Sequence, residues 1–273
     1  DGSIREADNK DGEVVDANLT PSYSNKAKET DYLICPIASN SLKVLKKEEF
    51  TPRKIKTPNG DSLFDFGQNI AGIIELDFTA KGGEELVITC GELLDKDGNL
   101  TLKNIQCSNK KKTTPLQRIK YKAKKGRNKW SMSFSVFGFQ YALVMGDIEL
   151  KENEIKAVAV YSDLERTGWF ESSNELLDKF VEATVWSTKG NSLDIPTDCP
   201  TRERHGWTGD AQIFYNTASY LFDYNTFSKK YMADVFDWQK KDGKLPQIAP
   251  YGGVDFYMSS MDGSVGWSDV GVL

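Results

Sequence analysis

The hydrophobic pattern of this 273-residue chain changes its period once, shortly after Tyr161. From about Thr51 to that point, short apolar and β-branched runs alternate with turn sequences such as Lys81-Gly82-Gly83 and residues 95–99. Short strands at roughly 8–12-residue spacing indicate an antiparallel β-sandwich. After Tyr161 the apolar residues recur three and four positions apart, which predicts amphipathic helices. The chain therefore combines an all-β unit with a helical unit that follows it.

The predicted strands are marked by alternating or continuous apolar residues. They cover residues 61–66, 73–78, 86–90, 134–145 and 155–161. Gly67-Gln68-Asn69 is a turn signal, so we expect a break between the first two strands. The polar residues before position 51 show little periodicity, apart from short apolar runs in 31–44 that fit edge strands.

Three helices are predicted after the change of period. Ser172 and Glu175 have the spacing of a capping box, so the first helix begins there. A second helix begins near Thr208 with Asp210 in its first turn, where the helix dipole favours an ionised carboxylate. A third helix covers about 225–239. The apolar face of the first helix is expected to be Leu176, Leu177, Phe180, Val181, Thr184 and Val185, and that of the third Phe227, Tyr231, Met232, Val235 and Phe236.

The segment 194–210, between the first two helices, is the densest in reactive side chains. It holds four carboxylates, two arginines and a tryptophan, while two prolines and two glycines keep most of it out of regular structure. Carboxylates accept hydrogen bonds from sugar hydroxyls and an indole packs on the C–H face of a pyranose, so the segment indicates a carbohydrate site. A simpler interpretation makes Asp198 a turn cap, leaves Glu203 in solvent, and uses Thr208 or Asp210 to start the next helix.

Composition narrows the classes of partner. The formal net charge is −5 and 39% of the residues are hydrophobic, which fits one large or two medium folded domains. The mild acidity gives no electrostatic case for nucleic acid or an anionic membrane. No apolar run reaches the length of a membrane helix. We therefore expect neither nucleic acid nor membrane as a partner.

Residue counts also narrow the chemistry. The chain has one histidine, His205, and four cysteines without CxxC spacing. A histidine-based zinc site is therefore disfavoured, and any Ser-His-Asp or Cys-His mechanism would depend on that one histidine. Asp97-Gly98-Asn99 lacks the ligand pattern of an EF-hand and is predicted to be a plain turn. We expect no metal and no cofactor.

The polar segment resembles the signature of bacterial α-L-rhamnosidases, glycoside hydrolase family 78. That signature reads Asp-Cys-Pro-x-Arg-(x)-Glu-Arg-x-Gly-Trp-Thr-Gly-Asp, and residues 198–210 show its shorter form, with His205 where an apolar residue is usual. Gly266-Trp267-Ser268-Asp269 is similar to the Gly-Trp-Gly-Asp element that follows it in the family. Residues 64–69 and 137–141 resemble the β-sandwich domain that precedes the catalytic barrel, although core packing is the simpler role for their aromatic rings.

The resemblance implies the domain organisation. It predicts an antiparallel β-sandwich followed by the first helices of an (α/α)6 toroid, the six-hairpin glycosidase fold, incomplete in this chain. We expect residues 1–50 to be the tail of an upstream domain or a linker, 51–163 the β-sandwich domain, and 164–273 the N-terminal part of the catalytic domain. Three or four helices cannot close such a toroid, so the chain is expected to be a truncated piece.

The resemblance also implies the activity and its residues. It predicts inverting acid/base hydrolysis that removes terminal α-L-rhamnose from rhamnosides of plant or bacterial glycans, with Glu203 as the general acid. The family's general base is a glutamate later in the catalytic domain, so we expect these residues alone to be inactive or nearly so. The substrate-binding residues implied are Asp198, Arg202, Trp207 and Asp210, with Trp267 and Asp269 on the far wall, where a capped loop and a packed indole are the alternative.

Two other classes of function stay open from the residues. One is a different glycosidase or a lyase on the same helical toroid. The other is a non-catalytic carbohydrate-binding protein built on the aromatic residues before Tyr161. The oligomeric state, the aglycone preference and the compartment, bacterial cytoplasm or periplasm, are not specified by the sequence.

Overall fold

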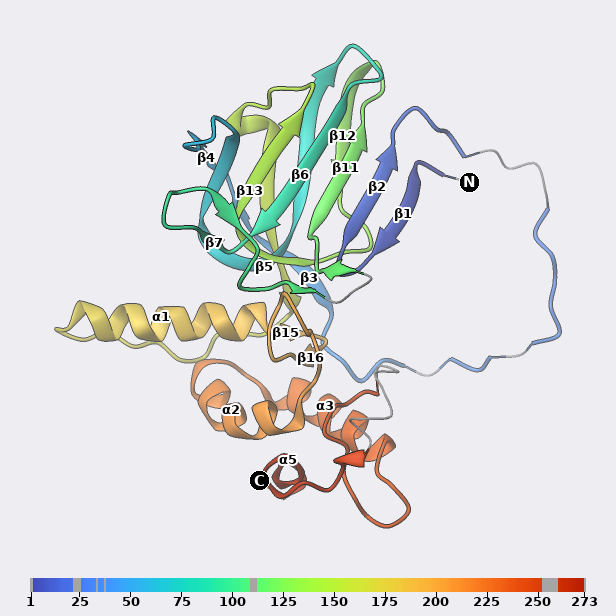
Figure 1. Ribbon diagram of the computed structural model, residues 1–273. Helices are drawn as coiled ribbons and strands as arrows, with labels where there is room; N and C mark the ends of the chain where they lie inside the picture. The colour runs from blue at the N-terminus through green and yellow to red at the C-terminus, as the bar shows by residue number, and fades with distance from the viewer. Residues whose placement is uncertain are drawn as a thin grey trace.

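The computed structural model describes residues 2–21, 26–32, 34–36, 38–108, 112–251 and 260–272. It confirms the predicted fold class, because a sheet-rich part leads into a part made of helices (Figure 1). The strands of the main sheet are β1 (Ile4–Asp8), β2 (Gly12–Asp16), β3 (Val44–Phe50), β4 (Arg53–Lys56), β5 (Ser62–Ala80), β6 (Glu85–Gly91), β11 (Arg118–Lys122), β12 (Gly126–Ser131), β13 (Phe137–Gly146) and β14 (Ile155–Ser162). Shorter pairs are β7 (Leu93–Leu94) with β8 (Leu100–Thr101), β9 (Cys107–Ser108) with β10 (Thr113–Thr114), and β15 (Ser192–Leu193) with β16 (Ile195–Pro196).

Strand β5 links the two layers of the sandwich. Its first half pairs with β4 and β13, and its second half pairs with β12 and β14. Beyond β13 the order continues through β6, β11, β2 and β1, while β3 lies beyond β14. The pairings of β5 are antiparallel, and the pairing of β11 with β2 is parallel. One long strand therefore carries a single hydrogen-bonded network through both layers.

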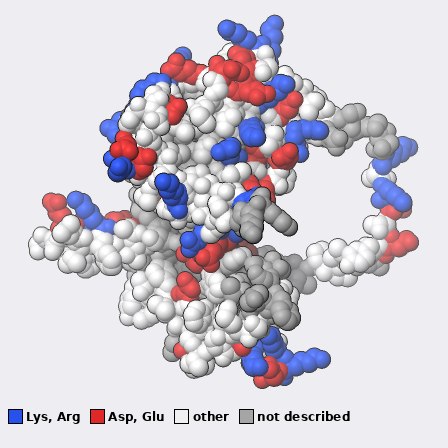
Figure 2. Space-filling model, in the orientation of Figure 1, with Lys and Arg blue, Asp and Glu red and all other residues white. Residues whose placement is uncertain are grey.

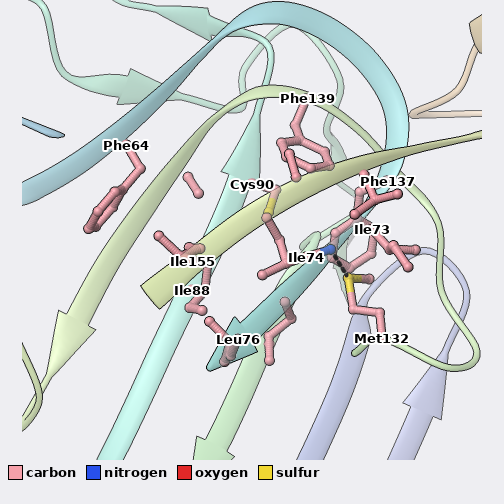
Figure 3. Packing of buried hydrophobic residues seen from close by; sticks show 14 of the residues in the cluster. Phe64, Ile73, Ile74, Leu76, Ile88, Cys90, Met132, Phe137, Phe139 and Ile155 are labelled. Atoms are coloured by element: carbon pink, nitrogen blue, oxygen red, sulfur yellow. Dashed lines mark hydrogen bonds between the residues drawn. The ribbon is translucent and has the colours of Figure 1, made fainter. Parts of the chain in front are cut away.

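The core lies between these layers and is built from the inward-facing residues of β5, β6, β13 and β14 (Figure 3). Phe78 of β5 packs edge-on against Tyr121 of β11, with ring centroids 5.9 Å apart. The rings of Phe64, Phe137 and Phe139 are completely buried. Core packing, the simpler role for these rings, is therefore the one that the structure shows.

The predicted break at residues 67–69 is wrong, because β5 runs through them. Gly67 takes a φ of +76°, a left-handed conformation that costs glycine little. The register against β13 shifts here, since Asp65 pairs with Tyr141 while Ile70 pairs with Phe139. The turn-like residues therefore form a bulge within one strand.

Two parts of the segment 1–50, expected as a tail or linker, pair with the sheet. β1 and β2 extend one edge and β3 extends the other. Glu13 of β2 is only 1% exposed, and its Oε1 accepts hydrogen bonds from the backbone N–H groups of Ser133, Phe134 and Ser135. Because a charged residue occupies a buried position of β2, the strand does not show the apolar alternation by which strands were predicted. The described residues from 26 to 43 form no strand, against the expectation for 31–44.

Helix α1 (Glu175–Gly190) begins slightly later than the capping box suggested. Its N-cap is Asn174, whose side chain accepts a hydrogen bond from the backbone N–H of Leu176. Only its C-terminal end packs on the sandwich, and its first turns extend away from the rest of the molecule (Figure 1). The predicted apolar face is therefore buried at Val185 but exposed at Leu176, Leu177 and Phe180.

Helices α2 (Thr208–Leu221) and α3 (Asn225–Asp237) begin at the predicted residues. Phe227, Tyr231 and Val235 are buried as expected, whereas Phe236 is exposed. The short helices α5 (Val265–Ser268) and η2 (Asp269–Gly271) pack against α2. Every helix among the described residues is too short or too polar to cross a membrane.

Candidate active site

Arg204 fixes the polar segment 194–210 to the sandwich. Its φ is +59°, which is unusual for a residue with a side chain. Its guanidinium donates hydrogen bonds to the backbone carbonyls of Thr201 (2.9 Å), Val136 (2.7 Å) and Asn9, and to Oε1 of Gln117 (3.2 Å). Burial lowers the pKa of Arg204 to about 10, so the side chain stays charged at neutral pH. One arginine therefore joins the segment to the residues just before β11 and β13 and to the β1–β2 turn.

Asp194, one of the four carboxylates of the segment, provides a second attachment of the segment to the rest of the fold. Its carboxylate accepts hydrogen bonds from Oγ of Ser41 (2.5 Å) and Nζ of Lys230 (2.8 Å), and its N–H donates to Oγ of Ser162 (2.9 Å). Burial alone would raise the pKa of Asp194, but the hydrogen bonds from Lys230 and Ser41 outweigh it and hold the pKa below its usual value. Asp194 holds α3 against the start of the segment and does not line the cleft described next.

A cleft of about 470 Å³ lies between the polar segment, the start of α2, and the sandwich. On the face drawn in Figure 2, acidic and basic side chains meet in a hollow between the sandwich and the helices. Six of the seven predicted site residues line the cleft, and Asp269 is outside its lining. The lining residues are Glu92, Asn104, Ile105, Asp198, Cys199, Thr201, Arg202, Glu203, Trp207, Asp210 and Trp267.

Both carboxylate oxygens of Glu203 have a donor. Oε2 accepts a hydrogen bond from Nε1 of Trp207 at 3.1 Å, and Oε1 accepts one from Nη2 of Arg202 at 3.3 Å. The backbone N–H of Glu203 points to Sγ of Cys199 at 3.3 Å. The carboxyl group is half-buried, so its orientation is set by an indole and an arginine within the cleft.

Asp198 both caps the segment and lines the cleft. Its Oδ1 accepts a hydrogen bond from the backbone N–H of His205 at 2.9 Å, and its own N–H donates to the carbonyl of His205 at 3.1 Å. The turn-cap interpretation is therefore confirmed for one oxygen, while a carboxylate retains further lone pairs for a ligand. Burial and the nearby charge of Lys10 lower the pKa of His205, which favours its neutral form.

Asp210 departs from the expectation for a helix N-terminus. It lies in the first turn of α2, as predicted. Partial burial, together with repulsion from Asp198 and Glu203, nevertheless raises the pKa of its carboxyl group. Burial is the main cause and the neighbouring carboxylates add to it, so ionised Asp210 lies in an unfavourable environment even at the start of a helix.

We expect Asp210→Asn to raise the melting temperature at about pH 7. Because the pKa of Asp210 is higher in the folded chain than its ordinary value of 3.8, its ionisation costs stability above the folded pKa, and this cost disappears as the pH falls toward 3.8. Melting curves of both proteins at about pH 7 and about pH 4 measure this. A lower melting temperature for the variant at pH 7, or a gain of equal size at both pH values, contradicts the assignment.

The two indoles come from different elements. Trp207 is the N-cap residue of α2. Trp267 lies on α5, and a Cβ added at Gly209 would be 3.0 Å from its Cε2 and Nε1 atoms. The ring of Trp267 therefore rests directly on the first turn of α2, where only glycine leaves room for it.

A second cavity of about 530 Å³ lies between α1, α2 and α5. It is larger and mostly apolar, and it shares Asp198, Asp210 and Trp267 with the cleft. Glu203, Arg202 and Trp207 line the cleft alone. We take the cleft as the reacting site because it contains the oriented carboxyl group. Within the described residues, no three His, Cys, Asp or Glu side chains are grouped as a metal site.

Family models match both parts of the chain. Residues 165–273 match the six-hairpin glycosidase domain of bacterial α-L-rhamnosidases, and residues 55–161 match the concanavalin-like domain of the same proteins. The chain belongs to the bacterial α-L-rhamnosidase family. The division expected near residue 163 falls between the two matched ranges. The signature segment lies in the range 165–273.

Individual rhamnosidases are similar along almost the whole chain. An α-L-rhamnosidase of Formosa agariphila is 32% identical over 288 residues, which cover 98% of this chain and 30% of the relative. The structure of Streptomyces avermitilis α-L-rhamnosidase complexed with L-rhamnose has a TM-score of 0.86 at 27% identity, covering 99% of this chain and 27% of that one. That of Dictyoglumus thermophilum α-L-rhamnosidase has a TM-score of 0.84 at 28% identity, covering 98% and 31%. The chain thus spans less than a third of the length of these rhamnosidases.

Sequence reasoning missed one wall of the cleft. Glu92, Asn104 and Ile105 come from the sandwich, around the β7–β8 hairpin. They lie about a hundred positions before the signature segment and show no motif of their own. Only tertiary packing places them opposite Glu203.

Proposed function

We propose that the protein hydrolyses terminal α-L-rhamnosides with inversion, and that Glu203 is the general acid. The observation that carries the proposal is the orientation of Glu203 by Trp207 and Arg202, inside a cleft that also holds two further carboxylates and a second indole. Membership of the rhamnosidase family supplies the sugar, since the Streptomyces avermitilis relative is described in complex with L-rhamnose. The bound species in the cleft is thus a deoxyhexose ring with its leaving group.

The chemistry follows from the residues. Protonated Glu203 gives its proton to the glycosidic oxygen as the bond from that oxygen to C1 breaks, and water adds to C1 from the opposite face. A second carboxylate, expected from the glutamate that follows later in the family's catalytic domain, takes the proton of that water. Asp198, Arg202 and Asp210 offer hydrogen bonds to ring hydroxyls. Trp207 and Trp267 offer apolar faces to the sugar.

Activity on a panel of aryl glycosides tests the substrate assignment. The longest natural chain containing these residues is expected to release phenol from an aryl α-L-rhamnoside and to leave aryl glucosides, galactosides and arabinosides almost untouched. Faster hydrolysis of another glycoside would leave the fold in place and refute the sugar. The expectation that residues 1–273 alone are nearly inactive is tested by assaying them beside the longer chain.

We expect Gly209→Ala to raise the KM for an aryl α-L-rhamnoside about 5-fold or more, with a smaller change in kcat. The added methyl meets the ring of Trp267 at 3.0 Å, so the indole must move out of its place beside the cleft. Steady-state kinetics measure the effect. Gly266→Ala is the matched control. Gly266 lies on the same short helix as Trp267, and a Cβ added there would have no neighbour within 4 Å. A KM change of equal size in both variants contradicts the role of Trp267.

A further inference from the structure

The sandwich supplies polar residues to the wall of the cleft opposite the signature segment. Glu92 follows directly after β6 and precedes β7, while Asn104 and Ile105 follow β8. All three line the same cleft as Glu203. The sandwich therefore contributes a carboxylate and a carboxamide to a cleft whose reacting group belongs to the helical part.

The carboxylate of Glu92 is oriented by two amides. Its Oε1 accepts a hydrogen bond from Nδ2 of Asn69 at 3.2 Å, and its Oε2 accepts one from Nδ2 of Asn104 at 3.1 Å. Asn69 belongs to the bulge of β5, so two separate segments hold the group. Each oxygen keeps a lone pair for another donor. Burial raises the pKa of Glu92 more than the two amide hydrogen bonds lower it.

The backbone around Glu92 is tightly packed. A Cβ added at Gly91 would lie 2.8 Å from Cδ2 of Leu102 and 3.0 Å from Cδ1 of Leu100. Ile105 is 2% exposed, and its N–H donates to the carbonyl of Leu102 at 3.0 Å. The hairpin is thus pressed against the end of β6, which keeps this wall in a fixed position before any ligand arrives.

The linings of the two cavities indicate where each part of a bound substrate lies. Asp198, Asp210 and Trp267 line both the cleft and the larger cavity between the helices, so they stand at the boundary between them. Glu203 and Glu92 line the cleft only. A sugar ring held at the boundary residues has its glycosidic oxygen near Glu203. The group beyond that oxygen then lies toward the sandwich wall.

We propose that Glu92 and Asn104 bind hydroxyl groups of the leaving-group sugar, so that the sandwich supplies a subsite for the reducing-side residue of a rhamnosyl disaccharide. The proposal rests on the proposed function of the cleft. A carboxylate beside a carboxamide suits vicinal hydroxyls, because one accepts and the other both donates and accepts. A flat aryl leaving group offers no such hydroxyls and gains nothing from this wall.

The test compares two substrates in the longest natural chain. For Glu92→Gln and Asn104→Ala we expect kcat/KM for an α-L-rhamnosyl-glucose disaccharide to fall about 10-fold or more, mainly through KM. For p-nitrophenyl α-L-rhamnoside the change is expected to stay within about 3-fold, and inhibition by free L-rhamnose is expected to be unchanged. Glu85→Gln is the matched control, because Glu85 is an exposed carboxylate at the other end of β6. It should leave kcat/KM for both substrates unchanged.

The outcomes separate the two proposals. Equal losses on both substrates, or no loss on the disaccharide, overturn the subsite. Should Glu92→Gln fail to fold, Asn104→Ala decides alone, since it leaves the carboxylate in place. A wild-type protein that hydrolyses neither rhamnoside refutes the proposed function itself, whatever the variants do.

Discussion

Glu203→Gln is expected to lower kcat for an α-L-rhamnosyl disaccharide by about 10²- to 10⁴-fold. Glutamine keeps the size of the side chain and an oxygen that can accept the hydrogen bond from Trp207, but it has no acidic proton to give to the leaving oxygen. A leaving group that needs no protonation avoids this loss. The same variant should therefore retain much more of its activity toward a 2,4-dinitrophenyl α-L-rhamnoside. Steady-state rates on both substrates measure the difference.

A matched control for this variant is Glu171→Gln, an exposed carboxylate just before α1. It should leave both rates unchanged. If Glu203→Gln lowers the rates for both substrates by the same factor, the residue contributes to binding or positioning and is not the acid. If the disaccharide rate hardly changes, another group supplies the proton.

Arg204→Met is expected to cause the largest loss of stability, about 2–4 kcal/mol. The methionine fills similar space but leaves the backbone carbonyls of Thr201, Val136 and Asn9 without their donor. The signature segment then loses its attachment to the sandwich, and activity should fall with the melting temperature. Thermal unfolding and kcat, measured on the same preparations, check both effects.

Arg202→Met is the natural comparison for Arg204→Met. Arg202 is exposed and its contact with Glu203 is 3.3 Å long, so its loss should lower activity while changing the melting temperature little. The two neighbouring arginines are thus expected to separate, one supporting the fold and the other serving the cleft. Similar melting temperatures for the two variants would contradict the anchoring role of Arg204.

The sequence predicts the parts of the fold that local patterns encode. The change of period after Tyr161 separates the sheet from the helices, and α2 and α3 begin where the helical periodicity places them. Strands β11 and β12 were not predicted, because they are short and offer few large apolar residues, Ile119 and Tyr121 in the first and Trp130 in the second. For α1, periodicity gives a correct helix but not which of its turns meet a partner. Such contacts depend on tertiary packing.

The candidate site divides in the same way. The signature segment brings Asp198, Arg202, Glu203, Trp207 and Asp210 together because they are close in sequence, and Trp267 joins them through the packing of α5 on α2. The direction of the pKa shift at Asp210 was not predictable, since it depends on burial and on carboxylates brought near it by folding. Glu92 was invisible for the same reason, because nothing near it in sequence marks it as part of a cleft.

The most direct test of the central claim is to follow hydrolysis of an aryl α-L-rhamnoside by proton NMR, using the longest natural chain that contains these residues. The first sugar signal to appear reports the configuration at C1 before mutarotation. The account predicts that β-L-rhamnose appears first, which requires cleavage of the rhamnosyl bond and attack by water from the opposite face. Release of α-L-rhamnose first, or no release of rhamnose at all, would contradict it.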